Sequence, residues 1–355
     1  MKNLSKKELK TITIFFLLSR LVLVFFLFYY HNLSSFNLYD VKNYIEIAKS
    51  GYSKELLYAF FPLWPILIRL FHIIIPSYSL VALLLSNLFS YFSAIIFYLI
   101  IHQNKENQKK ILFFLFSPIL VFTMIGYTES LYLFLTLLSF YFYKKEKYWF
   151  CGIILGLSML TRNTGIILLG AIGLEMLYHL YQKKITIKSI LSLAMPAIII
   201  GFSYNIFLYI QTGDFFKYIS VQYTEWSKEN CNMITLLFKD IHFLIKFHQT
   251  DSYLFLLNWS FVFLSLFYSI KNIKKEQAQS IYVIMSVLLF CMTCRNSTWI
   301  SLPSVGIFRY IYSLFPMYTL SHLKRKKYSF LLDTLYLSIS MINVIVVLKY
   351  HIFIA

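Results

Sequence analysis

Asp40 is the residue of this chain whose type and position most readily suggest chemistry. It lies in a polar interruption, residues 31–59, between one long apolar run and the rest of the apolar sequence. Only 15 of the 355 residues are acidic, so a carboxylate beside a membrane-length segment is a specific feature. Such a carboxylate can act as a general base that takes a proton from an attacking hydroxyl. It can also cap the helix that the next residues predict, and both interpretations stay open.

A second acidic group lies in the short connection of residues 126–130, between two apolar runs. Glu129 would be held there at membrane depth, where an unpaired carboxylate is costly. The next connection on the same side carries Arg162, so we expect an Arg162 to Glu129 ion pair. The pair could fix helix packing or contact a substrate, and the sequence leaves both open.

Further polar side chains lie near the ends of apolar runs. Arg309, if it faces the protein interior, would suit a phosphate group, although it could equally reach out to lipid phosphates. Residues 222–226 supply an amide in Gln222, a carboxylate in Glu225 and two aromatic platforms, Tyr223 and Trp226. These side chains could contact a sugar or a lipid headgroup, or they could belong to an interfacial aromatic belt.

The composition indicates the class of protein that must position these groups. Hydrophobic residues make up 59% of the chain and charged residues 14%, with a mean hydropathy of +0.67. That leaves too little polar surface for a soluble globule of this size. Apolar runs of about 15 to 23 residues recur from end to end, and no polar stretch is long enough to hold its own core. We therefore expect one all-α polytopic membrane domain over residues 1–355.

The net charge of +18 comes from basic residues gathered in short clusters between the apolar runs. Such clusters are a topology signal and not a nucleic-acid patch. If each cluster is cytoplasmic, the chain predicts about 11 full crossings, or 12 if one cluster is misplaced. The predicted spans are 11–30, 78–101, 111–126, 130–143, 148–161, 164–181, 188–210, 253–271, 278–294, 305–322 and 328–350.

The predicted topology assigns no membrane crossing to segment 60–76. It carries three prolines and a charge, which suit a lipid-facing span poorly. We expect a broken or re-entrant helix that floors the site. Before it, residues 43–52 alternate apolar and polar positions at helical spacing, which predicts an amphipathic interfacial helix that stops at Gly51.

The cysteines and histidines indicate no cofactor. Four cysteines, Cys151, Cys231, Cys291 and Cys294, form no disulfide framework or metal spacing, and we expect them to be apolar filler. The histidines are scattered, and there is no glycine-rich phosphate loop.

Several short motifs, in order, resemble those of the PIG-V-like mannosyltransferases and their bacterial relatives, which have the GT-C glycosyltransferase fold. The first is Tyr39-Asp40 followed by Ile47-Ala48 and Gly51-Tyr52, and the run from Ala59 to Pro65 comes next. Ser117-Pro118, residues 126–130, residues 161–165, Arg309-Tyr310 and Phe315-Pro316 then follow.

The resemblance implies a polyprenyl-phosphate sugar donor used on the exterior or luminal face. It maps the acid of the family's first exterior loop onto Asp40. It places a sugar platform at Tyr39, where the family usually has tryptophan. The implied reaction transfers a hexose, mannose in the eukaryotic members, to a lipid-linked or cell-surface glycan acceptor.

In that reaction Asp40 would be the base, and the leaving lipid phosphate would need positive charge nearby. Arg309, Arg162 and Arg69 are candidates for that role. A phosphodiester leaving group does not require a divalent metal, so we expect neither metal nor cofactor.

A lipid-linked sugar flippase or transporter is the alternative. It would spread polar groups through the membrane depth, whereas the clearest mid-span ionisable residues, Glu175 and Asp333, both lie toward the cytoplasmic side. That asymmetry favours an enzyme, although a structural subunit of another transferase is a third reading. Compact loops and the lack of a large soluble domain favour a bacterial plasma membrane over the endoplasmic reticulum.

Overall fold

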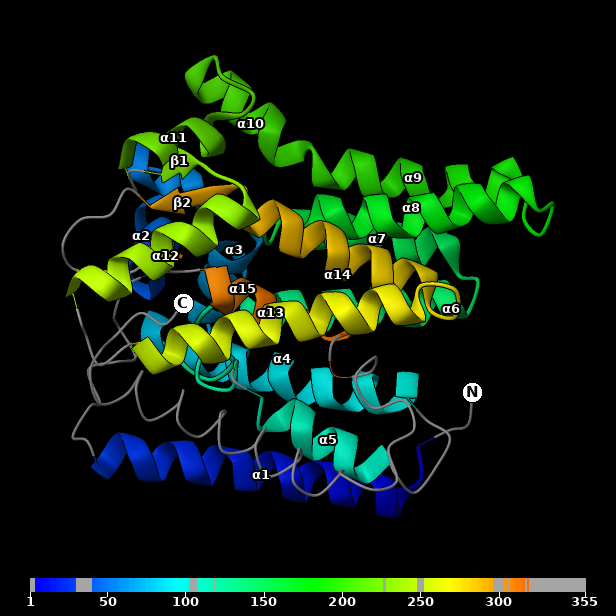
Figure 1. Cartoon of the computed structure of the whole chain (residues 1–355), viewed down its shortest axis with the longest axis horizontal. Coiled ribbons are helices and arrows are strands. Elements are labelled where there is room, and N and C mark those ends of the chain that lie inside the picture. The colour runs from blue at the N-terminus through cyan, green and yellow to red at the C-terminus, as the bar shows by residue number, and fades with distance from the viewer. Residues whose placement is uncertain are drawn as a thin grey trace.

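Figure 1 shows the computed structural model of the chain, which is mostly helical. It describes residues 4–29, 40–101, 107–117, 119–225, 228–247, 252–295, 303–304, 307–316 and 318. The first helices are α1 (Lys6–Tyr29), α2 (Asp40–Ser50), η2 (a 3₁₀ turn, Glu55–Ala59), α3 (Leu63–His72), α4 (Tyr78–Ile101), α5 (Asn107–Leu115), α6 (Glu129–Lys144) and α7 (Tyr148–Met159). The others are α8 (Gly165–Tyr181), α9 (Ile187–Gly201), α10 (Ser203–Thr212), α11 (Lys217–Glu225), α12 (Met233–Phe247), α13 (Ser252–Asn272), α14 (Gln277–Phe290) and α15 (Ile307–Tyr312). Strands β1 (Lys228–Asn230) and β2 (Thr293–Arg295) form one antiparallel pair.

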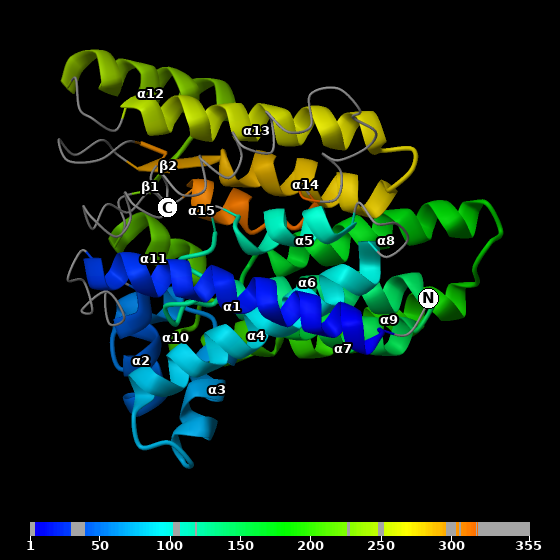
Figure 2. The ribbon, with the colours of Figure 1, turned by 90° about the horizontal axis from the view of Figure 1, so that it is seen from below.

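The long helices run roughly along one axis, and the short elements gather at one end of the bundle. Helices α2 and α11, strands β1 and β2, and α15 lie at that end (Figures 1 and 2). The α8–α9 and α13–α14 connections lie at the other end, as Figure 1 shows. Lys144 there pairs with Glu276 at 3.1 Å. The basic connections and the short elements therefore occupy opposite ends, as the topology prediction requires.

Three helical stretches within the described residues are long and apolar enough to cross a membrane: Lys6–Phe26, Tyr78–Ile101 and Ile187–Thr212. The last combines α9 and α10. Helices α3, α7, α8 and α14 are apolar but shorter. The structure thus confirms a mostly helical chain with membrane-length helices.

Helices α7 and α9 are in close contact because α7 has no side chain where they cross. A Cβ on Gly152 would lie 2.2 Å from the Leu193 carbonyl oxygen, and one on Gly156 would lie 2.7 Å from Cβ of Ile200. Two glycines four positions apart allow two backbones to approach in this way. Helix α7 also packs on α6, whose first residue is Glu129.

The single helix expected over 111–126 is wrong. Helix α5 ends at Leu115, and residues 119–126 form consecutive turns held by short-range bonds such as Met124 N to Val121 O at 3.0 Å. Proline has no N–H and disfavours helix at the residue before it, so Ser117-Pro118 is a natural end for the helix. Protein, not lipid, buries the apolar side chains that follow.

Two later predictions need correction as well. Helix α14 ends at Phe290, short of the expected 294, and the chain enters β2. The span expected over 305–322 contains the six-residue helix α15, after which Ser313 and Leu314 bond back to residues three positions earlier. The expected helix 328–350 lies outside the described residues.

The segment around Asp40 agrees with the sequence interpretation. Helix α2 runs from Asp40 to Ser50, ends before Gly51 and buries Val41, Tyr44, Ile45, Ile47 and Ala48 on one face. Residues 60–76 form the ten-residue helix α3 and not a long span. At 1.5 Å per residue, α3 is about 15 Å long, which is half the thickness of a hydrocarbon core.

Candidate active site

A cavity of about 840 Å³ opens at the end of the bundle where the short elements gather. Helix α2, the η2 turn with Phe60 and Phe61, and residues 161–164 contribute to its wall. Helix α11, both strands, the end of α14 and α15 complete it. Segments from nearly the whole chain therefore meet at one concave surface, which is where binding sites usually lie.

Asp40 is part of the cavity wall at the first residue of α2. A helix N-terminus stabilises a carboxylate because its free N–H groups point toward it. Arg309 Nη2 donates to Asp40 Oδ2 at 2.9 Å. The Asp40 side chain keeps about a fifth of its surface exposed, whereas that of Arg309 is 4% exposed. The acid is thus fixed on one side and open to the cavity on the other.

Glu129, the first residue of α6, joins the two arginines behind this wall. Its Oε1 lies 2.8 Å from Arg309 Nε and 3.2 Å from Arg162 Nη2. The Glu129 side chain is fully buried. Asp40, Arg309, Glu129 and Arg162 therefore form a continuous chain of alternating charge, in which two acids balance two bases.

Aromatic rings surround the two guanidinium groups. The Tyr310 ring lies between them, with the Arg162 guanidinium carbon 4.5 Å and the Arg309 carbon 5.0 Å from its centroid. The Arg309 guanidinium carbon also lies over the Tyr127 and Phe122 rings, 5.0 and 5.5 Å from their centroids. Cations over aromatic faces are attracted most strongly when water is excluded, as it is here.

The turn before α6 fixes the position of Glu129. Gly126 has φ 91, and a Cβ there would meet Cβ of Ala82 at 3.2 Å. Trp64 of α3 is fully buried and donates from Nε1 to the Gly126 carbonyl at 2.9 Å. The role of α3 is therefore to support this turn, and Ala59, Phe60 and Phe61 line the cavity directly.

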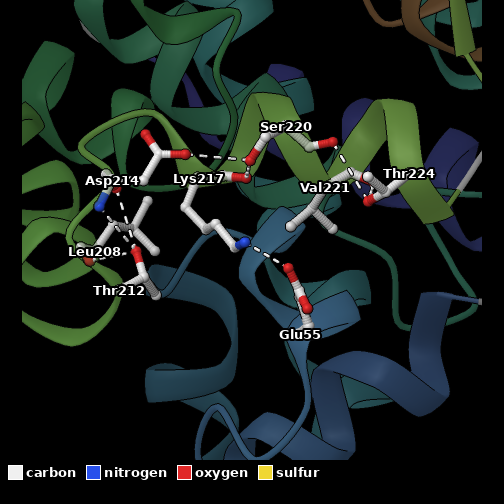
Figure 3. A network of polar contacts seen from close by, with 8 residues as sticks. All are labelled: Glu55, Leu208, Thr212, Asp214, Lys217, Ser220, Val221 and Thr224. Carbon is white, nitrogen blue, oxygen red and sulfur yellow. Dashed lines mark hydrogen bonds and ion pairs between the residues drawn. The ribbon is translucent and has the colours of Figure 1, made fainter.

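Helix α11 forms the facing wall and is tied to the first polar loop. Lys217 pairs with Glu55 of η2, and Figure 3 shows this contact from close by. Asp214 lies three residues before this helix: its Oδ1 accepts from the Phe216 backbone N–H at 2.8 Å, and its Oδ2 accepts from Ser220 at 3.2 Å. Gln222, five residues after Lys217, lines the cavity.

The local environment limits which groups can take a proton. Burial, reinforced by the charge of Asp40, raises the pKa of Tyr44. Its phenol, 3.4 Å from Thr128 Oγ1, therefore stays protonated at neutral pH. Burial disfavours a charged Arg162, but the adjacent Glu129 outweighs it and holds the pKa of Arg162 above its ordinary value. Among the cavity groups, a carboxylate is the suitable proton acceptor.

The site collects most of the residues singled out from the sequence. Asp40, Arg162, Arg309 and Gln222 line the cavity, and the predicted Arg162 to Glu129 pair is present. Glu129 itself lies behind the wall. Arg69, the third arginine proposed for the phosphate, is not brought to the cavity: it lies exposed on α3, and no residue of α3 lines the cavity. Tyr39 and Trp226 lie outside the described residues.

Several lining residues went unnoticed in the sequence as site residues. They are Asn43, Asn163, Tyr218, Lys228 and Asn230. Asn163 follows Arg162 in the motif of residues 161–165, and Asn43 lies one turn after Asp40. Closeness in sequence to a predicted site residue could therefore have pointed to both. Within the described ranges, no three His, Cys, Asp or Glu side chains lie close enough to hold a metal ion.

Comparison with known proteins agrees with these motifs. The sequence matches the mannosyltransferase (PIG-V) family over residues 15–352. The chain belongs to this family. Mouse GPI alpha-1,6-mannosyltransferase 2 is 27% identical over 192 residues, covering 48% of this chain and 39% of the mouse protein. The rat protein of the same name is 28% identical over 146 residues, covering 37% of this chain and 30% of its own length. Each match thus spans well under half of the curated relative.

Family membership confirms the resemblance stated from the sequence. The family match extends over nearly the whole chain and includes every segment that lines the cavity. With its membrane-length helices, the chain is an integral membrane protein of a mannosyltransferase family.

Proposed function

We propose that this chain is a membrane mannosyltransferase that moves mannose from a polyprenyl-phosphate donor to a lipid-linked or cell-surface glycan acceptor. The observation that carries the proposal is the position of Asp40, held by Arg309 at 2.9 Å, on the wall of a cavity at one end of the helix bundle. Family membership supports mannose as the transferred sugar. The cavity lies at the end of the bundle opposite the basic connections, which supports a reaction on the exterior or luminal face.

Asp40 acts as the general base. As the acceptor hydroxyl attacks the anomeric carbon, its proton passes to the Asp40 carboxylate and the bond from that carbon to the phosphate oxygen breaks. A positioned base of this kind supplies about 100- to 10,000-fold in rate. Arg309 keeps the carboxylate in place from the buried side, so that its exposed part faces the reacting hydroxyl.

The arginines stabilise the leaving group. Negative charge grows on the lipid phosphate as the bond to the sugar breaks, and preorganised cations near that charge lower the barrier. Arg162 and Arg309 both line the cavity and are held by Glu129, so neither has to reorganise during the reaction. Their charge makes a divalent metal unnecessary for this step, and no cofactor is part of the proposal.

The proposed architecture is of the GT-C type with about 11 to 12 crossings. Three membrane-length helices and four shorter apolar ones support it, and the expected helix 328–350 would add another. The names of the mouse and rat relatives specify an α-1,6 linkage, which we propose as the first product linkage to test. The compact polar loops support a bacterial plasma membrane as the location.

The test is a transfer assay on the purified chain in lipid nanodiscs with defined polyprenyl-phosphate sugars, read by mass spectrometry of the products. We expect Asp40→Asn to abolish transfer while it leaves the protein inserted. Glu46→Gln is the matched control. Glu46 lies on the same helix, does not line the cavity, and forms an ion pair with Lys54 at 2.8 Å. Near-wild-type turnover in Asp40→Asn would refute the role of Asp40. Translocation of the donor across proteoliposomes without transfer would instead support a transporter.

A further inference from the structure

Two cysteines that are 63 positions apart in the chain meet at the rim of the cavity. Cys294 is the central residue of β2 and faces Glu229 of β1. Cys231 follows β1 directly, and its backbone N–H donates to the Met292 carbonyl at 2.7 Å, which continues the ladder by one residue. Side chains two positions apart lie on the same face of a strand, so Cys231 and Cys294 are diagonal neighbours. The two side chains lie close enough for Cys294 to raise the pKa of the Cys231 thiol.

A lysine adjoins this thiol pair. Lys239 of α12 donates from Nζ to Cys294 Sγ at 3.2 Å and pairs with Glu229 Oε2 at 3.0 Å. The Lys239 ammonium group therefore holds the Cys294 sulfur in place by a direct hydrogen bond. Cys294 is buried by its neighbours but forms part of the cavity wall. Cys231 is half-exposed.

We propose that Cys231 and Cys294 form a reversible disulfide that closes the rim of the cavity by exchange with an external disulfide. The two cysteines lie at the end of the bundle opposite the basic connections, which is the side where oxidising compartments keep disulfides. The geometry of the strands carries the inference, and it does not depend on the proposed transferase activity.

The exchange proceeds in two balanced steps. The Cys294 thiolate attacks one sulfur of a small-molecule or protein disulfide and releases the first thiolate, leaving a mixed disulfide on Cys294. Cys231 then gives its proton to that released thiolate and attacks Cys294 Sγ, which expels the second thiolate. The two protein thiols lose two electrons and two protons in total, and the external disulfide becomes two thiols.

The order of attack follows from the surroundings of each sulfur. Burial and the neighbouring Cys294 raise the pKa of Cys231 to about 11, so Cys231 remains a thiol until Cys294 has reacted. Lys239 contacts Cys294, which makes Cys294 the sulfur that attacks first.

The disulfide would join two walls of the cavity. Strand β1 follows α11, and β2 follows α14, and residues of all four elements line the cavity. In the reduced protein, a three-residue ladder and the bond at Cys231 connect the strands. The disulfide would add a covalent bond across this short connection, closing a loop that contains α12, α13 and α14.

The test is peptide mapping of the full-length protein, purified without reductant after incubation with oxidised glutathione. We expect a peptide pair joined through Cys231 and Cys294, and a loss of two maleimide-reactive thiols in the denatured protein that dithiothreitol restores. Reduction should lower the melting temperature by roughly 5 °C. Four reactive thiols after oxidation would overturn the proposal.

The other cysteines supply the controls. Cys291 is buried at the end of α14, and the nearby Cys231 contributes to raising the pKa of the Cys291 thiol, so Cys291 is the competing partner. Cys291→Ser and Cys151→Ser should both keep the link, whereas Cys231→Ser and Cys294→Ser should lose it. A link that survives in Cys294→Ser would assign the bond to Cys291 and overturn the pairing. The mapping of the wild-type protein decides the matter even if a variant folds poorly.

Lys239→Gln tests the role given to the lysine. Without the ammonium group, the Cys294 sulfur loses the donor that contacts it, so the link should form about 3- to 10-fold more slowly and reach the same end point. Lys246→Gln, at the other end of α12, is the matched control and should leave the rate unchanged. An unchanged rate in Lys239→Gln would overturn the assignment of Cys294 as the attacking sulfur.

Discussion

Arg309 Nη2 lies 2.9 Å from Asp40 Oδ2, although 269 positions separate the two residues in the chain. The contact joins the helix inside the polar interruption to a six-residue helix near the end of the described chain. It gives Asp40 a fixed orientation that a helix cap alone would not need. The contact leaves the exposed part of the carboxylate on the cavity side.

Replacing Arg309 by lysine should lower mannose transfer by at least about 100-fold. Arg309 contacts Asp40 through Nη2 and Glu129 through Nε, and a single ammonium group cannot reproduce this fork. Steady-state transfer by the purified variant measures the effect. Arg69→Lys is the control and should be silent, because Arg69 is exposed away from the cavity. Wild-type transfer by Arg309→Lys would exclude a role for the fork.

Glu129→Gln separates the two interpretations left open for Glu129. The fully buried carboxylate balances Arg309 and Arg162, so its loss should destabilise the protein by about 3 to 5 kcal/mol. Thermal unfolding in detergent measures this, with Glu46→Gln as the exposed control. A variant with normal stability but weaker substrate binding would instead show that Glu129 contacts the substrate.

Much of the helical framework could be predicted because the length of each apolar run is visible in the sequence. Helices α1, α4, α6, α8 and α13 lie close to their predicted spans. The Arg162 to Glu129 pair was predictable because both residues occupy short connections on one side of the bundle, where each charge requires a partner.

Other features could not be predicted, for physical reasons. Hydropathy does not distinguish burial by lipid from burial by protein, which is why the buried turns at 119–126 were taken for a span. Strands β1 and β2 are three residues each, too short for an alternating pattern. The partner of Asp40 and the meeting of Cys231 with Cys294 depend on long-range packing, which no local spacing encodes.

Gly126→Ala should destabilise the protein by about 1 to 2 kcal/mol and reduce transfer as well. Gly126 has φ 91, and the added Cβ would press on Ala82 at 3.2 Å, displacing the turn that leads to Glu129. Gly173→Ala in α8 is the matched control: nothing lies within 4 Å of its Cβ position, so helix propensity should stabilise it by up to about 1 kcal/mol. Equal melting temperatures for the two variants would contradict this account of the turn.

Asp240 of α12 should make stability depend on pH in the acidic range. Burial raises its pKa from 3.8 to about 6, although Trp259 Nε1 and the Ser304 backbone N–H donate to its two oxygens at 3.0 and 3.1 Å. Between these two values the folded protein holds a proton that the unfolded chain has lost, so stability should fall as pH rises from about 4 to about 6. The shift corresponds to roughly 3 kcal/mol, at 1.4 kcal/mol per pKa unit. Melting temperatures in detergent from pH 4 to 7 measure it. Asp240→Asn should lack this component, and parallel curves for variant and wild type would show that Asp240 does not titrate in this range.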